Sequence, residues 1–224
     1  MTPDRRTALT AGLLYLATFA TSVPALALKT AYFAGDAGRA AASLGAVLEL
    51  LLAAACVGTA LVLFPVTRRI SEPLGLGFVV SRTLEATMIM VGVLALLGTA
   101  ALRDAGHAAA AAPLVALHDA SFLLGPAVMA AVNALLLGTV MYRGRLVPRV
   151  IPLTGLIGAP LLLASSVGVL CGAWSQTSPV AAIATVPVAL WELSLGVWLT
   201  VKGFTPGDTR SVTRSSRDRS PVAA

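Results

Sequence analysis

Six long apolar runs constrain this chain more than any other feature of its sequence. Each is about 20 residues long or longer, the length that an α-helix needs to cross the hydrocarbon core of a bilayer. They lie at residues 8–28, 43–66, 77–102, 114–142, 150–174 and 179–201. Because lipid cannot hydrogen-bond to a peptide backbone, each run is expected to satisfy its own backbone groups as a helix. The sequence therefore predicts an all-α fold, a bundle of six transmembrane helices.

The composition fits one integral membrane domain. Hydrophobic residues make up 57% of the 224 residues and charged residues only 12%, too few charges to cover a water-soluble protein of this length. The net charge of +6 could suit nucleic acid, but the basic residues lie between and after the apolar runs. Lysine and arginine in such positions set membrane orientation. We therefore expect the lipid bilayer as a partner, and no nucleic acid.

The distribution of basic residues predicts that both termini lie in the cytoplasm. Twelve of the sixteen Lys and Arg fall in the N-terminus, the second and fourth loops and the tail, whereas three, Lys29 among them, fall in the alternate loops. An even number of spans also requires both ends on one side. The expected organisation is a cytoplasmic N-terminus at 1–7, a membrane domain at 8–204 and a disordered, polar cytoplasmic tail at 205–224.

The first apolar run also permits a second interpretation. Arg5 and Arg6 precede it, and Ala25-Leu26-Ala27 has the small-residue spacing of a signal-peptide cleavage site. Cleavage there would leave five spans and an N-terminus outside the cell. An uncleaved first helix is favoured, because polytopic membrane proteins often use their first helix as an anchor.

Polar side chains inside the apolar runs are the candidate functional residues. A charge at the centre of a membrane helix costs about 2.5–3.5 kcal/mol, so each should have a partner or a function. Depth, counted at about 1.5 Å per residue, places an inner cluster in the middle and cytoplasmic half of the bundle. It comprises Arg82, Glu85, Asn133 and Glu192. The planar guanidinium of Arg82 can serve two carboxylates, so we expect it to bridge Glu85 and Glu192.

A second, outer cluster is expected near the opposite membrane surface. It comprises Glu49, His118 and Asp119, each about five or six residues inside an outer helix end. Histidine and carboxylate ligands suit zinc or manganese. However, adjacent residues on a helix point about 100° apart, and the chain has no HExxH motif, so a hydrogen-bonded plug is favoured over a metal site. We expect no metal and no cofactor.

Two of the prolines fall in the middle of the fourth and sixth apolar runs. Pro126 and Pro187 should each free a backbone carbonyl one turn back, near Phe122 and Ile183. A freed carbonyl beside polar side chains can line a cavity. Packing alone is the favoured explanation, because membrane helices tolerate proline.

Several segments taken together resemble a known family. These segments are Leu14–Phe19, Ser81–Thr87, Leu117–Pro126, Asn133–Gly138, Arg145–Pro152 and Leu190–Gly196. Over about residues 8–205 the chain resembles the actinobacterial and bacterial multipass membrane family known as domain of unknown function 4386. The resemblance implies an integral membrane protein without an assigned activity, and it carries over no catalytic residue.

The sequence leads to three functional hypotheses. The favoured one is a small transporter-like or ligand-sensing protein of the bacterial plasma membrane, which binds a small molecule or a lipid at the inner cluster. The alternative is a structural or accessory membrane protein whose polar core only specifies helix packing. An intramembrane enzyme that acts on lipid through the outer cluster is least favoured, since no Walker A, GxGxxG, GxSxG or CxxC motif occurs. Neither the ligand nor the oligomeric state follows from the sequence.

Overall fold

The computed structural model describes residues 2–205, which are helical apart from short connections. The α-helices are α1 (Pro3–Ala34), α2 (Arg39–Ile70), α3 (Glu72–Asp104), α4 (Ala112–Phe122), α5 (Ala130–Arg143), α6 (Val150–Leu170) and α7 (Pro179–Val201). A 3-10 turn, η1 (Ala108–Ala111), precedes α4, and a π-helix, η2 (Leu123–Met129), joins α4 to α5. Six helical segments are long and apolar enough to cross a membrane, the fourth running from Ala108 to Arg143. The predicted all-α bundle with six such helices is confirmed.

The first helix is longer than the predicted first span. It includes most of the segment expected as an N-terminal extension at 1–7, and it continues past Lys29. It begins where Thr2 accepts a hydrogen bond from Arg5 N, a standard cap for a helix N-terminus. It ends at Gly35, whose φ of 89° is the left-handed conformation that glycine adopts without strain. Helix α1 therefore carries side chains of the predicted first loop into the bundle.

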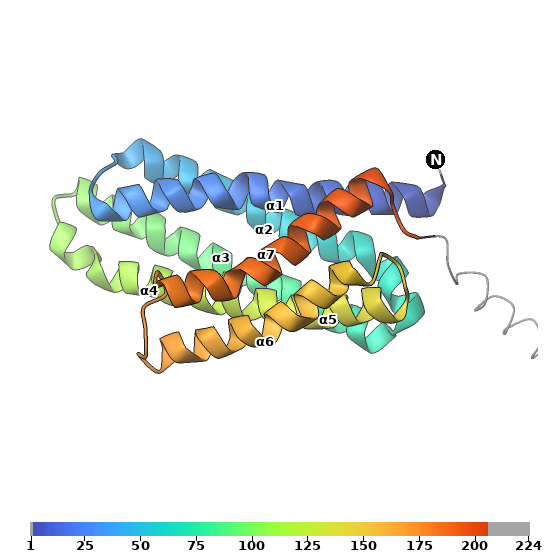
Figure 1. Cartoon of the computed structure of the whole chain (residues 1–224). Helices are drawn as coiled ribbons and strands as arrows, with labels where there is room; N and C mark the ends of the chain where they lie inside the picture. Colours follow the sequence, from blue (N-terminus) through green and yellow to red (C-terminus); the bar gives the residue numbers. More distant parts are fainter. Residues whose placement is uncertain (1, 206–224) are drawn as a thin grey trace, which may run out of the picture.

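The described chain begins and finishes at the same end of the bundle (Figure 1). This terminal end also carries the α2–α3 and α5–α6 connections, whereas the opposite, distal end carries the α1–α2, α3–η1 and α6–α7 connections. Helices that follow one another in the chain pack together, and α7 closes the bundle against α1. The tail expected at 205–224 lies, from residue 206 onward, outside the described residues.

Two arginines bind helix ends to neighbouring helices. Arg5 of α1 donates to carbonyls in the last turn of α7, at 3.0 Å to Leu199 O and 2.7 Å to Thr200 O. At the distal end, Arg103 of α3 donates to Tyr32 O in the last turn of α1, at 2.7 Å. The last carbonyls of a helix have no intrahelical donor and carry partial negative charge. A neighbouring arginine supplies both a hydrogen-bond donor and a positive charge. These contacts fix the axial position of α1 relative to α7 and α3.

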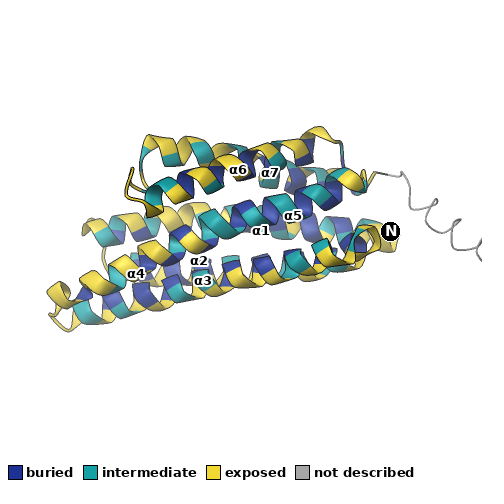
Figure 2. Cartoon of the chain, turned by 90° about the horizontal axis from the view of Figure 1, so that it is seen from below, coloured by how far each residue is buried: buried dark blue, intermediate teal, exposed yellow. Residues whose placement is uncertain are grey.

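The long helices each expose one side to the surroundings (Figure 2), and that side is largely apolar. Large aliphatic side chains of α1, α2, α3, α6 and α7 are strongly exposed, such as Leu94 at 68% and Ile183 at 71%. The surfaces that face the bundle instead carry many alanine, glycine and hydroxyl side chains. Lipid accepts such an apolar exterior, and small inward residues let helix backbones approach closely. The arrangement suits a bundle that is surrounded by hydrocarbon.

Gly12 packs against the backbone of α7, and this contact yields a prediction. A Cβ atom on Gly12 would lie 2.6 Å from Thr200 N and 2.8 Å from Gly196 O, closer than such atoms pack. Gly12→Ala should therefore force α1 and α7 apart. The matched control is Gly77→Ala, whose Cβ meets only the Leu136 side chain, at 3.4 Å. Relative to this control, Gly12→Ala is expected to lower the free energy of unfolding by about 1–3 kcal/mol.

Thermal unfolding of the two detergent-purified variants measures this difference. Both changes replace a helical glycine by alanine, so the gain in helix propensity is similar and cancels in the comparison. Equal melting temperatures for the two variants would contradict the described contact between α1 and α7.

Candidate functional site

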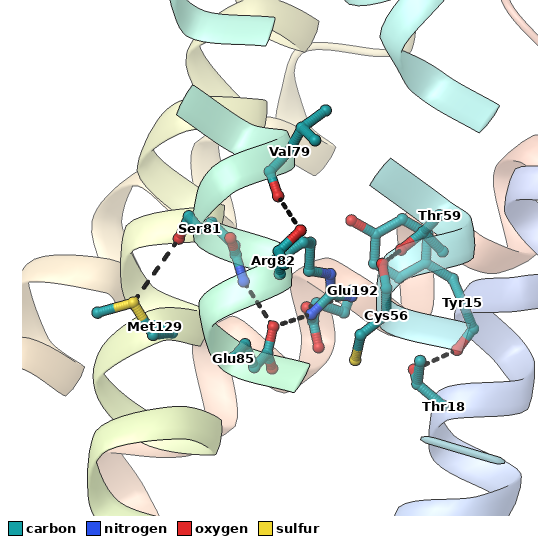
Figure 3. A network of polar contacts seen from close by, with 12 residues as sticks. Tyr15, Thr18, Cys56, Thr59, Val79, Ser81, Arg82, Glu85, Met129 and Glu192 are labelled. Carbon is teal, nitrogen blue, oxygen red and sulfur yellow. Dashed lines mark hydrogen bonds and ion pairs between the residues drawn. The ribbon is translucent and has the colours of Figure 1, made fainter. Parts of the chain in front are cut away.

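Three helices bring the predicted inner cluster together inside the bundle (Figure 3). Helix α3 presents Arg82 and Glu85 on one face, because residues three apart on a helix are neighbours. Glu85 Oε2 accepts from Arg82 Nη1 at 2.6 Å and from Asn133 Nδ2 of α5 at 2.7 Å. Helix α7 contributes Glu192, whose Oε1 lies 3.4 Å from Arg82 Nη2. Arg82 thus contacts both carboxylates, as the sequence led us to expect.

Arg82 is almost completely enclosed. It is 1% exposed, and its guanidinium lies 5.2 Å from the centre of the Tyr15 ring of α1, in a cation–π contact. Within the described residues its Nε and Nη2 are buried without a hydrogen-bond acceptor. The Glu192 side chain is 16% exposed, compared with 7% for Glu85. The cluster therefore holds one cation and two carboxylates, and Glu192 is the less constrained carboxylate.

A cavity of about 140 Å³ lies beside the inner cluster. Arg82, Glu85 and Glu192 all line it, together with Cys56 of α2 and Thr185 of α7. One ordered water needs only about 10–15 Å³ of such volume. The inner cavity is therefore large enough for several waters or a small polar group in direct contact with the charged side chains.

The predicted outer residues do not form one group. Glu49 of α2 pairs with Lys29 of α1, and both side chains are buried. His118 of α4 packs against Phe33, with ring centres 4.8 Å apart. Asp119 points outward with 66% of its side chain exposed, so its place in a buried cluster was wrong. A helix turns by about 100° per residue, so the burial of His118 directs Asp119 away from the interior.

The separation of Glu49 from His118 and Asp119 also determines whether these residues can bind a metal ion together. Among residues 2–205, no three His, Cys, Asp or Glu side chains lie close enough together to hold one metal ion. Glu49 is engaged by an ammonium group, and the carboxylate of Asp119 lies 3.3 Å from His118 Nδ1. The outer residues are thus two separate polar contacts.

Lys29 is the polar residue that the sequence interpretation missed. The predicted first span ends at residue 28, which puts Lys29 in a loop, but α1 continues past it and leaves it 2% exposed. Its ammonium contacts Glu49 and lies 5.1 Å from the centre of the Phe122 ring. The sequence does hold a signal for this position, since no glycine or proline follows Lys29 until Gly35.

Two further cavities lie between the distal end and the inner cavity. A distal cavity of about 410 Å³ is lined by His118, Asp119 and the residues before α7. A middle cavity of about 250 Å³ is lined by Lys29 and Glu49. The distal and middle cavities share Leu26, Lys29, Phe122 and Gln176. The middle and inner cavities share Ser22, Leu52, Pro126, Leu162 and Thr185. We call these three adjoining cavities the cleft.

The π-helix η2 forms part of the cleft wall. Pro126 lies within it and lines both the middle and the inner cavity. Proline has no backbone N–H, and the wider π turn accommodates the interrupted hydrogen-bond ladder. With its amide turned to satisfy both groups, Gln176 donates to Asp119 O and accepts from Leu123 N, each at 3.2 Å. Pro187, in contrast, leaves α7 continuous.

Comparison with known proteins bears on the identity of the chain. A family model described as domain of unknown function (DUF4386) matches residues 10–203. This match reaches from the first to the last of the six helices that are long and apolar enough to cross a membrane. No curated protein and no solved structure matches the chain. The chain is therefore an integral membrane protein that belongs to the family described as domain of unknown function DUF4386.

Proposed function

We propose that this protein is a small transporter-like or ligand-sensing membrane protein, and that the inner cluster is its binding locus. The observation that carries the proposal is the loose pairing of Glu192. Glu192 lines the inner cavity. Among residues 2–205 it makes one ion-pair contact, at 3.4 Å and without a hydrogen bond, to a guanidinium that already donates to Glu85. A buried charge that served packing alone would be fully paired and enclosed, because incomplete pairing is costly.

The cleft supports the same function. A ligand needs a route from the membrane surface to a buried site, and intramembrane charges commonly mark such routes. The distal, middle and inner cavities share wall residues along one such route. Toward the terminal end, the described part of the chain is closed by fully buried apolar side chains, such as Leu63, Leu195 and Leu199. Access from one side suits either a sensor or one state of a transporter.

One observation favours the alternative, a structural or accessory protein whose polar core specifies packing. Glu85 joins α3 to α5 by accepting hydrogen bonds from both Arg82 and Asn133, and all three are at least 95% buried. A network of that kind can fix helix register. The alternative explains Glu85 well, but it does not explain why Glu192 borders a cavity.

We further propose that both termini lie in the cytoplasm of a bacterial cell and that the distal cavity opens outside the plasma membrane. The terminal end carries exposed arginines at the ends of helices, including Arg68 and Arg143, whereas Arg69 lies 3.6 Å from a carboxylate oxygen of Asp4. At the distal end, Arg39 pairs with an aspartate of α3, and Arg103 binds carbonyls of α1. Unpaired basic charge therefore accumulates at the terminal end, as the positive-inside rule expects of a cytoplasmic surface.

Glu192→Gln tests the proposed function. Glutamine keeps the size of the side chain and removes its charge, so the loss of one 3.4 Å contact should lower stability by only about 1 kcal/mol or less. We expect near-normal folded yield in detergent, measured by size-exclusion chromatography, and failure to complement a growth phenotype of the deletion strain.

Glu72→Gln is the control, because that exposed carboxylate at the start of α3 lies outside the cleft. Parallel loss of yield and complementation by Glu192→Gln would support the packing alternative. Full complementation by this variant would remove Glu192 from the proposed function.

A further inference from the structure

Glu49 lines the middle cavity, and one of its carboxylate oxygens has no hydrogen-bond donor among the described residues. Its side chain is 7% exposed and lines that cavity. Lys29 contacts Oε1, whereas Oε2 is buried without a donor among residues 2–205. A buried carboxylate oxygen without a donor is costly, and a ligand that supplies an N–H removes this cost. The partner that this oxygen requires is therefore a hydrogen-bond donor.

The charge of the cleft selects a cationic donor. Its buried Lys, Arg and Glu side chains are two basic and three acidic ones, namely Lys29, Arg82, Glu49, Glu85 and Glu192. When all five are ionised and His118 is neutral, one negative charge is uncompensated. Away from water, uncompensated negative charge attracts a cation and repels an anion more strongly than it would in solution. A neutral donor would leave this imbalance unchanged, whereas a monocation reduces it.

The remaining wall of the middle cavity fits an apolar body. Most of its residues are aliphatic, and Phe122 already faces the Lys29 ammonium at 5.1 Å, the kind of contact that aromatic rings make with ammonium ligands. Helices α1 and α7 meet near the terminal end and diverge toward the distal end (Figure 1). Val23 and Leu26 of α1 line the cavity and are 65% and 48% exposed on the outer surface. The cavity thus borders the surface that faces lipid, from which an amphiphile can enter.

We propose that the middle cavity binds an amphiphilic organic monocation, a primary ammonium group on a small apolar body, with Glu49 as its counter-ion. The inference rests on the proposed function, because it names the ligand class of the same cleft. The ammonium donates to Glu49 Oε2 beside Phe122, and the apolar body lies along Leu52, Leu123 and Leu162. A volume of about 250 Å³ is below the range of pockets for drug-sized ligands, which favours a body of about one ring.

Three probes of similar size and different charge test the ligand class. The full-length protein in phosphatidylcholine nanodiscs is titrated with 2-phenylethylammonium, 2-phenylethanol and 3-phenylpropanoate, and binding is measured by saturation-transfer NMR. Empty nanodiscs correct for partition into lipid. The ammonium probe is expected to bind at least about tenfold more tightly than either relative.

Two variants locate the binding site. Glu49→Gln removes the carboxylate charge, and the double variant Lys29→Met/Glu49→Gln removes both charges of the pair. The double variant protects against misfolding, because it leaves no unpaired charge in the interior. Each is expected to weaken binding of the ammonium probe at least about tenfold. Asp119 lies outside the middle cavity, so Asp119→Asn should change the affinity for the ammonium probe by about twofold or less.

The outcomes separate this inference from the proposed function. Equal binding of the three probes, or ammonium binding that survives the double variant, overturns the inference. Preferential binding of 3-phenylpropanoate overturns the ligand class but leaves a ligand-binding cleft. No binding of any probe, with complementation still lost in Glu192→Gln, also overturns only the ligand class. Both proposals fail if no probe binds and Glu192→Gln complements normally.

Discussion

Arg82→Met is expected to lower the free energy of unfolding by about 3–5 kcal/mol. Methionine preserves much of the arginine stem. Within the described residues, it leaves Glu85 with Asn133 as its one hydrogen-bond partner and removes the single ion-pair contact of Glu192. Uncompensated carboxylates in a low-dielectric interior are costly, and removal of one member of a buried pair has this effect. The change also removes the cation–π contact with Tyr15.

Unfolding in mixed detergent micelles, followed by circular dichroism, measures the loss. The triple variant Arg82→Met/Glu85→Met/Glu192→Met removes every charge of the cluster and should recover most of the stability, because apolar replacement of a buried ion network is often neutral. Arg82→Lys should fall between wild type and Arg82→Met, since an ammonium supplies the charge without the planar fork. A triple variant that is less stable than Arg82→Met would show that uncompensated charge is not the source of the loss.

The inner cluster could be predicted because depth and helical face both follow from the sequence. Arg82 and Glu85 are three residues apart, so they share a face whatever the neighbouring helices do. Their distance from the ends of the apolar run sets their depth, and the same count brings Glu192 to a similar level. The hydrogen bond from Asn133 to Glu85 did not follow, because the rotation of α5 about its axis depends on packing against α3 and α6.

The distal end could be predicted less well, for two physical reasons. The chemistry of His118 and Asp119 does not by itself say which of these adjacent residues faces inward, and packing of the imidazole against Phe33 decides it. The end of the first span was placed where hydropathy falls, at Lys29, although a helix continues through a lysine when a buried carboxylate can pair with it. Glu49 supplies that carboxylate from α2, at a sequence separation of 20 that local patterns do not reveal.

Lys29→Met is therefore the second substitution with a large expected effect. It should lower the free energy of unfolding by about 3–5 kcal/mol, because it leaves the Glu49 carboxylate buried and without its cation. A lysine in a solvated loop, which the distribution of basic residues alone suggests, would lose almost nothing on the same change. The free energy of unfolding of Lys29→Met thus separates a structural role of Lys29 in the bundle from a role in membrane orientation alone.

Arg39→Met is the matched control at the same end of the bundle. Arg39 pairs with Asp104, but the two side chains are 49% and 54% exposed, so water screens the pair and its loss should cost about 1 kcal/mol or less. The double variant Lys29→Met/Glu49→Gln should recover most of the stability lost in Lys29→Met, since neither charge is then left alone. Equal, small losses for Lys29→Met and Arg39→Met would contradict the burial of Lys29 and, with it, the counter-ion arrangement of the middle cavity.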